Sequence, residues 1–265
     1  MAITEVVVHS LGELINQVTP TEPDLRTGRR RDSGVYRGDR DARWPLLTSL
    51  DKLGGAAKPH SKADLEEHIL RNFIRYSRPY FTHPPVNEWE VLVAAKHHGL
   101  PTRLLDWTYS PLVAAHFATL SGDQSSDRVV WRLDWKSVHR SFKLPELALL
   151  IQDLEGILGD ERPLTPWRLF AGQAEIREFA CMLEPPSLNA RIVAQSSTFT
   201  LCSEKRQSFD RFLEGHGLGS ALTKFVIPAK ETARFRDQLD LVSVDERRLF
   251  PDLDGVAAEM KRYYS

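Results

Sequence analysis

The chain has 265 residues, of which 42% are hydrophobic and 27% are charged, a composition typical of a globular protein with a real core. Its 35 basic and 36 acidic residues give a net charge of -1, so bulk electrostatics offer no reason to expect nucleic acid or an acidic membrane as the partner. The two cysteines, Cys181 and Cys202, have no metal-type or redox-type spacing, and no apolar run approaches the roughly 20 residues of a membrane helix. We therefore expect a cytoplasmic protein with no disulfide framework and no membrane partner.

Local signals predict most elements of the first half of the chain. Ser10, with an acid three residues later, is a helix N-cap, and Ser110-Pro111 is a second helix start. Gly99 and Pro101 predict the end of a helix. In chain order we expect a strand at 6–8, a helix from Ser10, a loop over 19–33, a strand at 34–38, helices over 63–76 and 88–98, a strand at 104–108 and a helix from Ser110.

The second half is expected to alternate strands and helices. Residues 129–133 predict a strand, and Thr165-Pro166 predicts a helix start within a mainly helical stretch over 136–180. We interpret Arg191 to Cys202 as two short strands joined by Gln195-Ser196-Ser197, followed by a strand at 225–227. Helices are expected at about 229–239 and 253–264, with a capping box at Ser243-Val244-Asp245-Glu246 between them.

These elements indicate an α+β fold, with a short mixed β-sheet and helices in one compact body. No internal repeat, low-complexity segment or clear linker divides the chain. We divide it into an N-terminal strand, helix and loop (1–33) and a larger domain with a C-terminal helical extension (34–265).

Arg37 is the first candidate functional residue. It ends a short strand between an aromatic residue and Gly38, and a glycine there lets backbone or ligand approach closely. A guanidinium in that position suits bidentate binding of a phosphate or carboxylate. A structural ion pair with Asp39 or Asp41 is the alternative.

The second candidate region runs from His97 to Thr108 and joins a helix end, a rigid turn and a strand. Asp106 lies in a strand that otherwise appears buried, and a buried carboxylate must be paired. It is therefore expected to pair with Arg103 or Arg37. Trp107 is the tryptophan expected to line a ligand, whereas His116 is interpreted as a core histidine.

The sequence argues against several other kinds of site. A metal site of His97, His98 and Asp106 is disfavoured because adjacent helical histidines point about 100° apart. No Gly-x-Ser-x-Gly elbow, phosphate-binding P-loop or Gly-x-Gly-x-x-Gly turn is present. We expect no metal, and a metal-dependent hydrolase remains a minor alternative.

Four segments in a fixed order carry a family resemblance. They are Tyr36-Arg37-Gly38-Asp39, Trp44-Pro45-Leu46-Leu47-Thr48-Ser49-Leu50, the whole stretch from His97 to Thr108, and Ser110-Pro111-Leu112-Val113-Ala114-Ala115-His116-Phe117-Ala118. Together they resemble the FRG domain, a family named for a Phe-Arg-Gly tripeptide, with Tyr36 in the place of the phenylalanine. The resemblance is specific over about 34–135 and continues more weakly to Gly255.

The resemblance implies a layout similar to that of ADP-ribosyltransferases, with NAD as the substrate. Arg37 would bind the NAD pyrophosphate, and Thr108 would be the hydroxyl residue that precedes a helix. Gln195, or Arg191, falls where such enzymes carry a catalytic acid that stabilises the cationic sugar. Because that segment offers no carboxylate, Gln195 or Asp106 would take the role, or the chain would bind a nucleotide without turning it over.

These implications give an NAD-dependent ADP-ribosyltransferase or NAD glycohydrolase as the leading hypothesis, with a bacterial toxin or defence role. The alternative is a non-catalytic nucleotide-binding sensor module. The expected partner is a nucleotide-type small molecule, with an unidentified macromolecular target. The expected catalytic residues are Arg37, Asp106, Thr108 and Gln195, and the expected ligand-binding residues are Tyr36, Arg37, Gly38, His98, Arg103, Trp107 and Arg191.

Overall fold

A computed structural model describes residues 2–25, 27–53, 62–81, 85–120, 125–157, 164–170, 177–185, 190–203 and 207–264. The described strands form one seven-stranded sheet in the order β1-β7-β4-β2-β3-β6-β5. Only the β1/β7 pair is parallel among these neighbours. The strands are β1 (Thr4–Val7), β2 (Val35–Asp39), β3 (Leu105–Thr108), β4 (Arg128–Leu133), β5 (Ala180–Leu183), β6 (Ser197–Cys202) and β7 (Leu222–Ile227).

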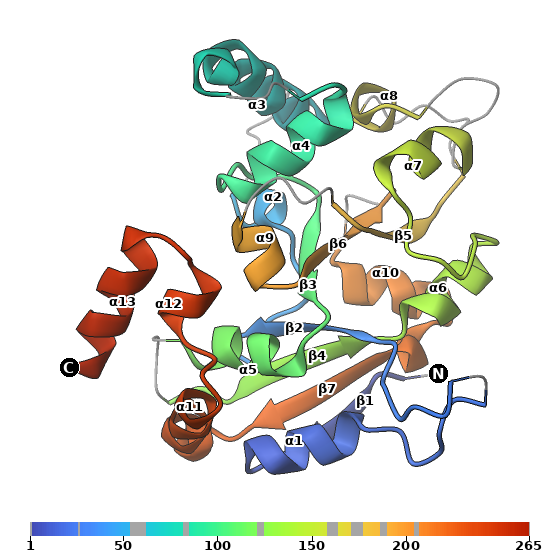
Figure 1. Ribbon diagram of the computed structural model, residues 1–265. Helices are drawn as coiled ribbons and strands as arrows, with labels where there is room; N and C mark the ends of the chain where they lie inside the picture. The colour runs from blue at the N-terminus through green and yellow to red at the C-terminus, as the bar shows by residue number, and fades with distance from the viewer. Residues whose placement is uncertain are drawn as a thin grey trace.

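The middle of the sheet is nearly divided. β2 pairs with β4 over five residues and β3 pairs with β6 over four, but β2 and β3 meet only at Tyr36 and Thr108. Figure 1 shows β3 running steeply away from the direction of β2 and β4. The sheet therefore has two halves, β1-β7-β4-β2 and β3-β6-β5, and we call the single-pair contact between them the seam.

Helices cover both halves of the sheet, as Figure 1 shows. Short 3-10 turns occupy Arg78–Tyr80, Gly219–Ala221 and Ala229–Glu231. The α-helices are α1 (Leu11–Val18), α2 (Ser49–Lys52), α3 (Lys62–Ser77), α4 (Glu88–His97), α5 (Pro111–Thr119), α6 (Trp135–Ser141), α7 (Ile151–Ile157), α8 (Pro166–Phe170), α9 (Ala190–Ala194), α10 (Phe209–Gly215), α11 (Thr232–Leu241), α12 (Glu246–Leu249) and α13 (Leu253–Tyr263).

Three apolar clusters form the core. One lies between β1, β2, β4 and β7 and helices α1, α5 and α11, and a second covers the other face of that half with α6 and α10. The third joins β5 and β6 to helices α3, α4, α7 and α8, and buries Trp89. No helix in the described part of the chain is long and apolar enough to cross a bilayer. The fold is α+β, as expected from the sequence.

The predicted helix boundaries with clear capping signals are confirmed. Ser10 accepts a hydrogen bond from the Glu13 amide at the start of α1, and Ser110 accepts one from the Val113 amide at the start of α5. Gly99 follows α4 with a φ of 84°, in the left-handed region that suits glycine. These signals succeeded because a cap depends on only a few neighbouring residues.

Two element predictions were wrong. Residues Ala190–Ala194 form the short helix α9 rather than a strand, although β6 follows as expected. The β-branched pair at 192–193 favoured a strand, but only Ile192 is buried, so a helical turn satisfies the packing. The predicted capping box at Ser243 is also wrong, because Asp245 caps α12 by accepting from the Arg248 amide.

Candidate functional site

A large cleft opens beside the seam of the sheet. Its volume is about 1060 Å³, at the upper end of the range for small-molecule sites. Its walls come from β2, β3, the ends of α2 and α4, α9 and the turn between α12 and α13. The lining residues with charged or aromatic side chains are Tyr36, Arg37, Asp39, Arg40, Trp44, Lys52, Lys96, His97, His98, Asp106, Trp107, Phe117, Arg191 and Asp252.

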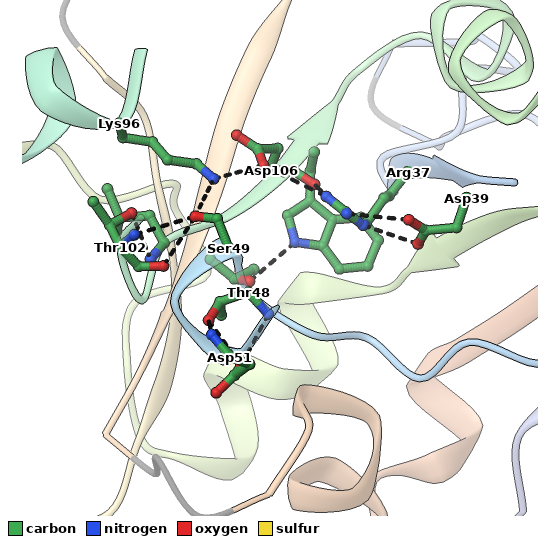
Figure 2. Close-up of polar contacts among 11 residues, drawn as sticks. Arg37, Asp39, Thr48, Ser49, Asp51, Lys96, Thr102 and Asp106 are labelled. Atoms are coloured by element: carbon green, nitrogen blue, oxygen red, sulfur yellow. Dashed lines mark hydrogen bonds and ion pairs between the residues drawn. The ribbon is translucent and has the colours of Figure 1, made fainter. Parts of the chain in front are cut away.

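Arg37 bridges the seam where regular strand pairing stops. Its Nε and Nη2 donate to the two carboxylate oxygens of Asp39, at 3.0 and 3.1 Å, and its Nη1 donates to the Asp106 carbonyl at 3.1 Å. Burial opposes the charged guanidinium, but Asp39 and Asp106 outweigh this effect and raise the pKa of Arg37. The structural ion pair with Asp39 is confirmed, and it leaves the guanidinium fixed at the cleft wall (Figure 2).

Gly38 has a structural reason to be glycine. A Cβ on this residue would lie 1.9 Å from the Ala114 carbonyl oxygen and 2.5 Å from the Ala118 amide nitrogen. Helix α5 therefore packs directly on the backbone of β2, on the face of the strand opposite to Arg37. Gly38 thus sets the position of the strand that carries Arg37.

The two aromatic residues expected at the ligand face the core instead. Tyr36 is 2% exposed, packs in the α5 cluster and donates its hydroxyl hydrogen to Asp32. Trp107 is 3% exposed, and its Nε1 donates to Thr200 Oγ1 at 3.0 Å. Both residues border the cleft, but their rings belong to the packing beneath it.

Asp106 presents its carboxylate to the cleft. Its side chain is 53% exposed, so the prediction that it is buried was wrong. Lys96 Nζ lies 2.8 Å and Arg37 Nη1 lies 3.6 Å from Oδ2, and Figure 2 shows the two cations approaching from opposite sides. Partial desolvation opposes ionisation, but Lys96 and Arg37 outweigh it and lower the pKa of Asp106. The carboxylate is therefore ionised and held in place at neutral pH.

Lys96 was missed by the sequence analysis as a site residue. Its side chain is 8% exposed, and its Nζ donates to Ser49 Oγ at 3.3 Å as well as pairing with Asp106. Ser49 Oγ also accepts from the Thr102 amide at 3.1 Å, which ties the α2 start to the turn before β3. The one signal in the sequence was that Lys96 lies in the last turn of α4, next to His97.

Arg103 lies in the packing behind the cleft. It is 4% exposed and pairs with Glu66 of α3, with Nη2 and Nε at 2.6 and 2.7 Å from Oε2. Its guanidinium also covers the Phe170 ring, 4.7 Å from the centroid. Of the two partners expected for Asp106, Arg37 is therefore the one that the structure shows, whereas Arg103 pairs with Glu66 instead.

Thr108 and Gln195 come together at the cleft but are bonded to the protein. Thr108 Oγ1 donates to the Gln195 carbonyl at 2.7 Å and accepts from the Ser110 amide at 3.1 Å. Gln195 Nε2 donates to the Leu249 carbonyl at 3.0 Å. These contacts fix the junction of β3, α5 and α9, and they connect it to α12.

Two histidines and an arginine form another part of the cleft lining. His97 and His98 make an edge-to-face contact with ring centroids 5.3 Å apart, and His98 is exposed. Arg191 covers the Phe250 ring at 4.5 Å. Burial, Arg191 and His98 lower the pKa of His97, which favours the neutral form of its imidazole at pH 7. Among the described residues, no group of three or more His, Cys, Asp or Glu side chains is arranged to hold a metal ion.

The cleft has an excess of positive charge that the whole chain lacks. Five lysines and arginines line it against three aspartates, an excess of two positive charges when the histidines are neutral, whereas the chain has a net charge of -1. Such an enclosed excess favours an anionic ligand. The basic lining residues are Arg37, Arg40, Lys52, Lys96 and Arg191.

A comparison with protein families matches residues 32–127 to the FRG domain. No curated protein and no solved structure gives a significant match. The matched segment contains β2, β3, α4 and α5, and so supplies the Arg37, Lys96 and Asp106 side of the cleft together with the glycine that seats α5. The chain therefore carries an FRG domain over residues 32–127.

Proposed function

We propose that this FRG-domain protein binds NAD in the cleft and cleaves the bond between nicotinamide and ribose. ADP-ribose would then pass to water or to an acceptor molecule. The observation that supports this proposal best is an exposed, ionised carboxylate, Asp106, held by Lys96 and Arg37 inside a cation-rich cleft. A dinucleotide needs both features, because it brings two phosphate charges and develops a positive charge on its ribose.

Arg37 is the residue that would bind the pyrophosphate. A guanidinium has five N–H donors, and three of its hydrogen bonds go to Asp39 and the Asp106 carbonyl. One hydrogen on each terminal nitrogen lies outside these three bonds; the one on Nη2 remains for a phosphate oxygen, whereas Nη1 also faces Asp106 Oδ2 at 3.6 Å. Because Asp39 and the Asp106 carbonyl already fix the side chain, its ordering cost is met before the ligand binds.

Asp106 is the residue that would act on the sugar. The glycosidic C–N bond breaks, and nicotinamide leaves with the bonding electron pair as a neutral base. The ribose is left as a cation, which a nearby carboxylate stabilises. Oδ2 of Asp106 pairs with Lys96 and Arg37, and Oδ1 is the oxygen that would act on the ligand. Water or the acceptor then attacks the sugar and gives up a proton.

Binding without turnover is the second candidate. It is favoured by the contacts of Thr108 and Gln195, whose hydroxyl and amide groups would position the ribose but already bond to Gln195 O, Ser110 N and Leu249 O. A protein of this kind would sense a nucleotide and pass the signal to a partner.

Nicotinamide release from labelled NAD, followed beside calorimetric titration, distinguishes the two candidates. We expect Asp106→Asn to keep NAD affinity within a few fold and to lower turnover by about a hundredfold or more. Asp254→Asn is the matched control, because Asp254 is exposed on α13 and does not line the cleft. Binding without nicotinamide release in the unaltered protein would favour the sensor, and no NAD binding would refute both.

A further inference from the structure

An exposed tryptophan and a lysine meet at the edge of the cleft. Trp44 is 40% exposed, whereas Trp89 and Trp131 are buried in the core. Lys52, the last residue of α2, places its Nζ 5.6 Å from the centroid of the Trp44 ring. Both residues line the cleft, and neither was singled out as a site residue from the sequence.

Lys52 has no carboxylate within ion-pair distance among the residues that the structure describes. Burial and the charge of Arg37 lower its pKa, and Lys96 adds to this repulsion. Arg37, Lys52 and Lys96 therefore repel one another. The two carboxylates that act on Lys52, Asp39 and Asp106, are already paired with Arg37 or Lys96. An anion next to Lys52 would relieve this repulsion.

We propose that Trp44 and Lys52 form the subsite for the adenosine phosphate half of the ligand. The Trp44 ring stacks on the purine base, and the Lys52 ammonium binds the adjacent phosphate together with Arg37. This inference rests on the proposed dinucleotide function and adds the direction of the ligand. The pyrophosphate lies at Arg37, the adenosine lies at Trp44, and the nicotinamide half lies toward Asp106.

The contact between Lys52 and Trp44 does not prevent a nucleotide from binding at these two residues. A cation over an exposed aromatic ring is weakly held, and stacking of a nucleobase on an aromatic side chain is stronger. The lysine side chain is flexible, so its ammonium can leave the ring for a phosphate.

The chain supplies a matched control for this pair. Lys136 lies over Trp135 with its Nζ 5.7 Å from the ring centroid, almost the distance found for Lys52 and Trp44. That pair does not belong to the cleft, and Trp135 is 7% exposed. Lys136→Gln therefore removes a similar cation–π contact without touching the proposed subsite.

The test is calorimetric titration with ADP, which carries the proposed adenosine phosphate half alone. We expect Trp44→Ala to weaken ADP binding by about tenfold or more, with Trp44→Phe retaining most of the affinity. Lys52→Gln should weaken it about fivefold or more, whereas Lys136→Gln should stay within twofold. Nicotinamide mononucleotide, which lacks the adenosine, should bind equally to the unaltered protein and Trp44→Ala.

The experiment distinguishes failure of the proposed subsite from failure of the proposed reaction. ADP affinity that is absent, or unchanged in both Trp44→Ala and Lys52→Gln, would overturn the subsite even if the unaltered protein releases nicotinamide from NAD. Loss of ADP affinity in these variants would support the subsite even if no nicotinamide is released, in which case only the proposed reaction fails. For an active enzyme, Trp44→Ala should raise the KM for NAD more than it lowers kcat.

Discussion

Replacing Glu66 with glutamine should destabilise the protein strongly without touching the cleft. Glu66 is 1% exposed, and its carboxylate accepts from the Arg103 backbone amide at 2.9 Å and pairs with the guanidinium at 2.6 Å. Removing one partner of a buried ion pair leaves the other charge uncompensated, which costs about 3–5 kcal/mol. With an m-value of about 3 kcal/mol/M, the urea midpoint should fall by about 1 M or more. Tryptophan fluorescence can follow the transition.

Glu67→Gln is the control, one residue along the same helix. Glu67 pairs with Arg71 at 3.6 Å, and both side chains are well exposed, so the loss should be about 0.5 kcal/mol or less. NAD affinity measured without urea should be the same in Glu66→Gln and the unaltered protein. Equal urea midpoints for the two variants would refute a structural role for the buried pair. A selective loss of NAD affinity in Glu66→Gln would instead indicate that Arg103 contributes to ligand binding.

Three further changes have defined outcomes. Gly38→Ala should lower the free energy of unfolding by about 1–3 kcal/mol, because the new methyl group collides with the α5 backbone. Gly12→Ala on α1, whose methyl group would lie at an ordinary contact distance of 3.9 Å from Ser10 Oγ, should raise it slightly in the same thermal melts. Burial and Arg236 lower the pKa of His116 to about 4, below its unfolded value, so stability is lost as the pH falls from about 6.5. In urea titrations the loss should reach about 2 kcal/mol at pH 5, and it should be absent in His116→Gln. Glu246→Gln removes the carboxylate that pairs with Arg236 and Arg262. Limited proteolysis should then cut at α13 sooner, and NAD affinity should fall because the turn before α13 lines the cleft. Unchanged cleavage would exclude this ionic contact as the anchor of α13.

The sequence predicted local features of the fold better than the arrangement of the strands. The starts of α1 and α5 and the end of α4 follow from capping residues, since each cap is satisfied within a few positions. α9 was predicted as a strand because five residues are too few for periodicity to decide. The seam between β2 and β3 depends on contacts between distant segments, and no local pattern encodes it.

The sequence also predicted only part of the candidate site, because some of its residues are brought together by distant segments. Arg37 was recognised because it lies at a strand end between an aromatic residue and a glycine, and Asp106 because a carboxylate inside an apolar strand is unusual. Lys52 and Lys96 were missed because a lysine near the end of a helix is ordinary, and only the tertiary fold brings both to the cleft. The exposure of Asp106 follows from the divergence of β3 from β2, which turns an interior strand position into a cleft wall.

Because β2 and β3 pair at a single position, Arg37 also helps to hold the two halves of the sheet together. Along most strand contacts several backbone hydrogen bonds resist separation, but β2 and β3 pair at one position, and the bond from the Arg37 guanidinium to the Asp106 carbonyl adds a second link across the seam. A ligand phosphate bound to the remaining donors of this guanidinium would hold it in place and stiffen the joint between the two halves of the sheet. Since α5 is seated on Gly38, it would move with β2 as one rigid body, and the seam would act as a hinge whose stiffness the ligand itself controls.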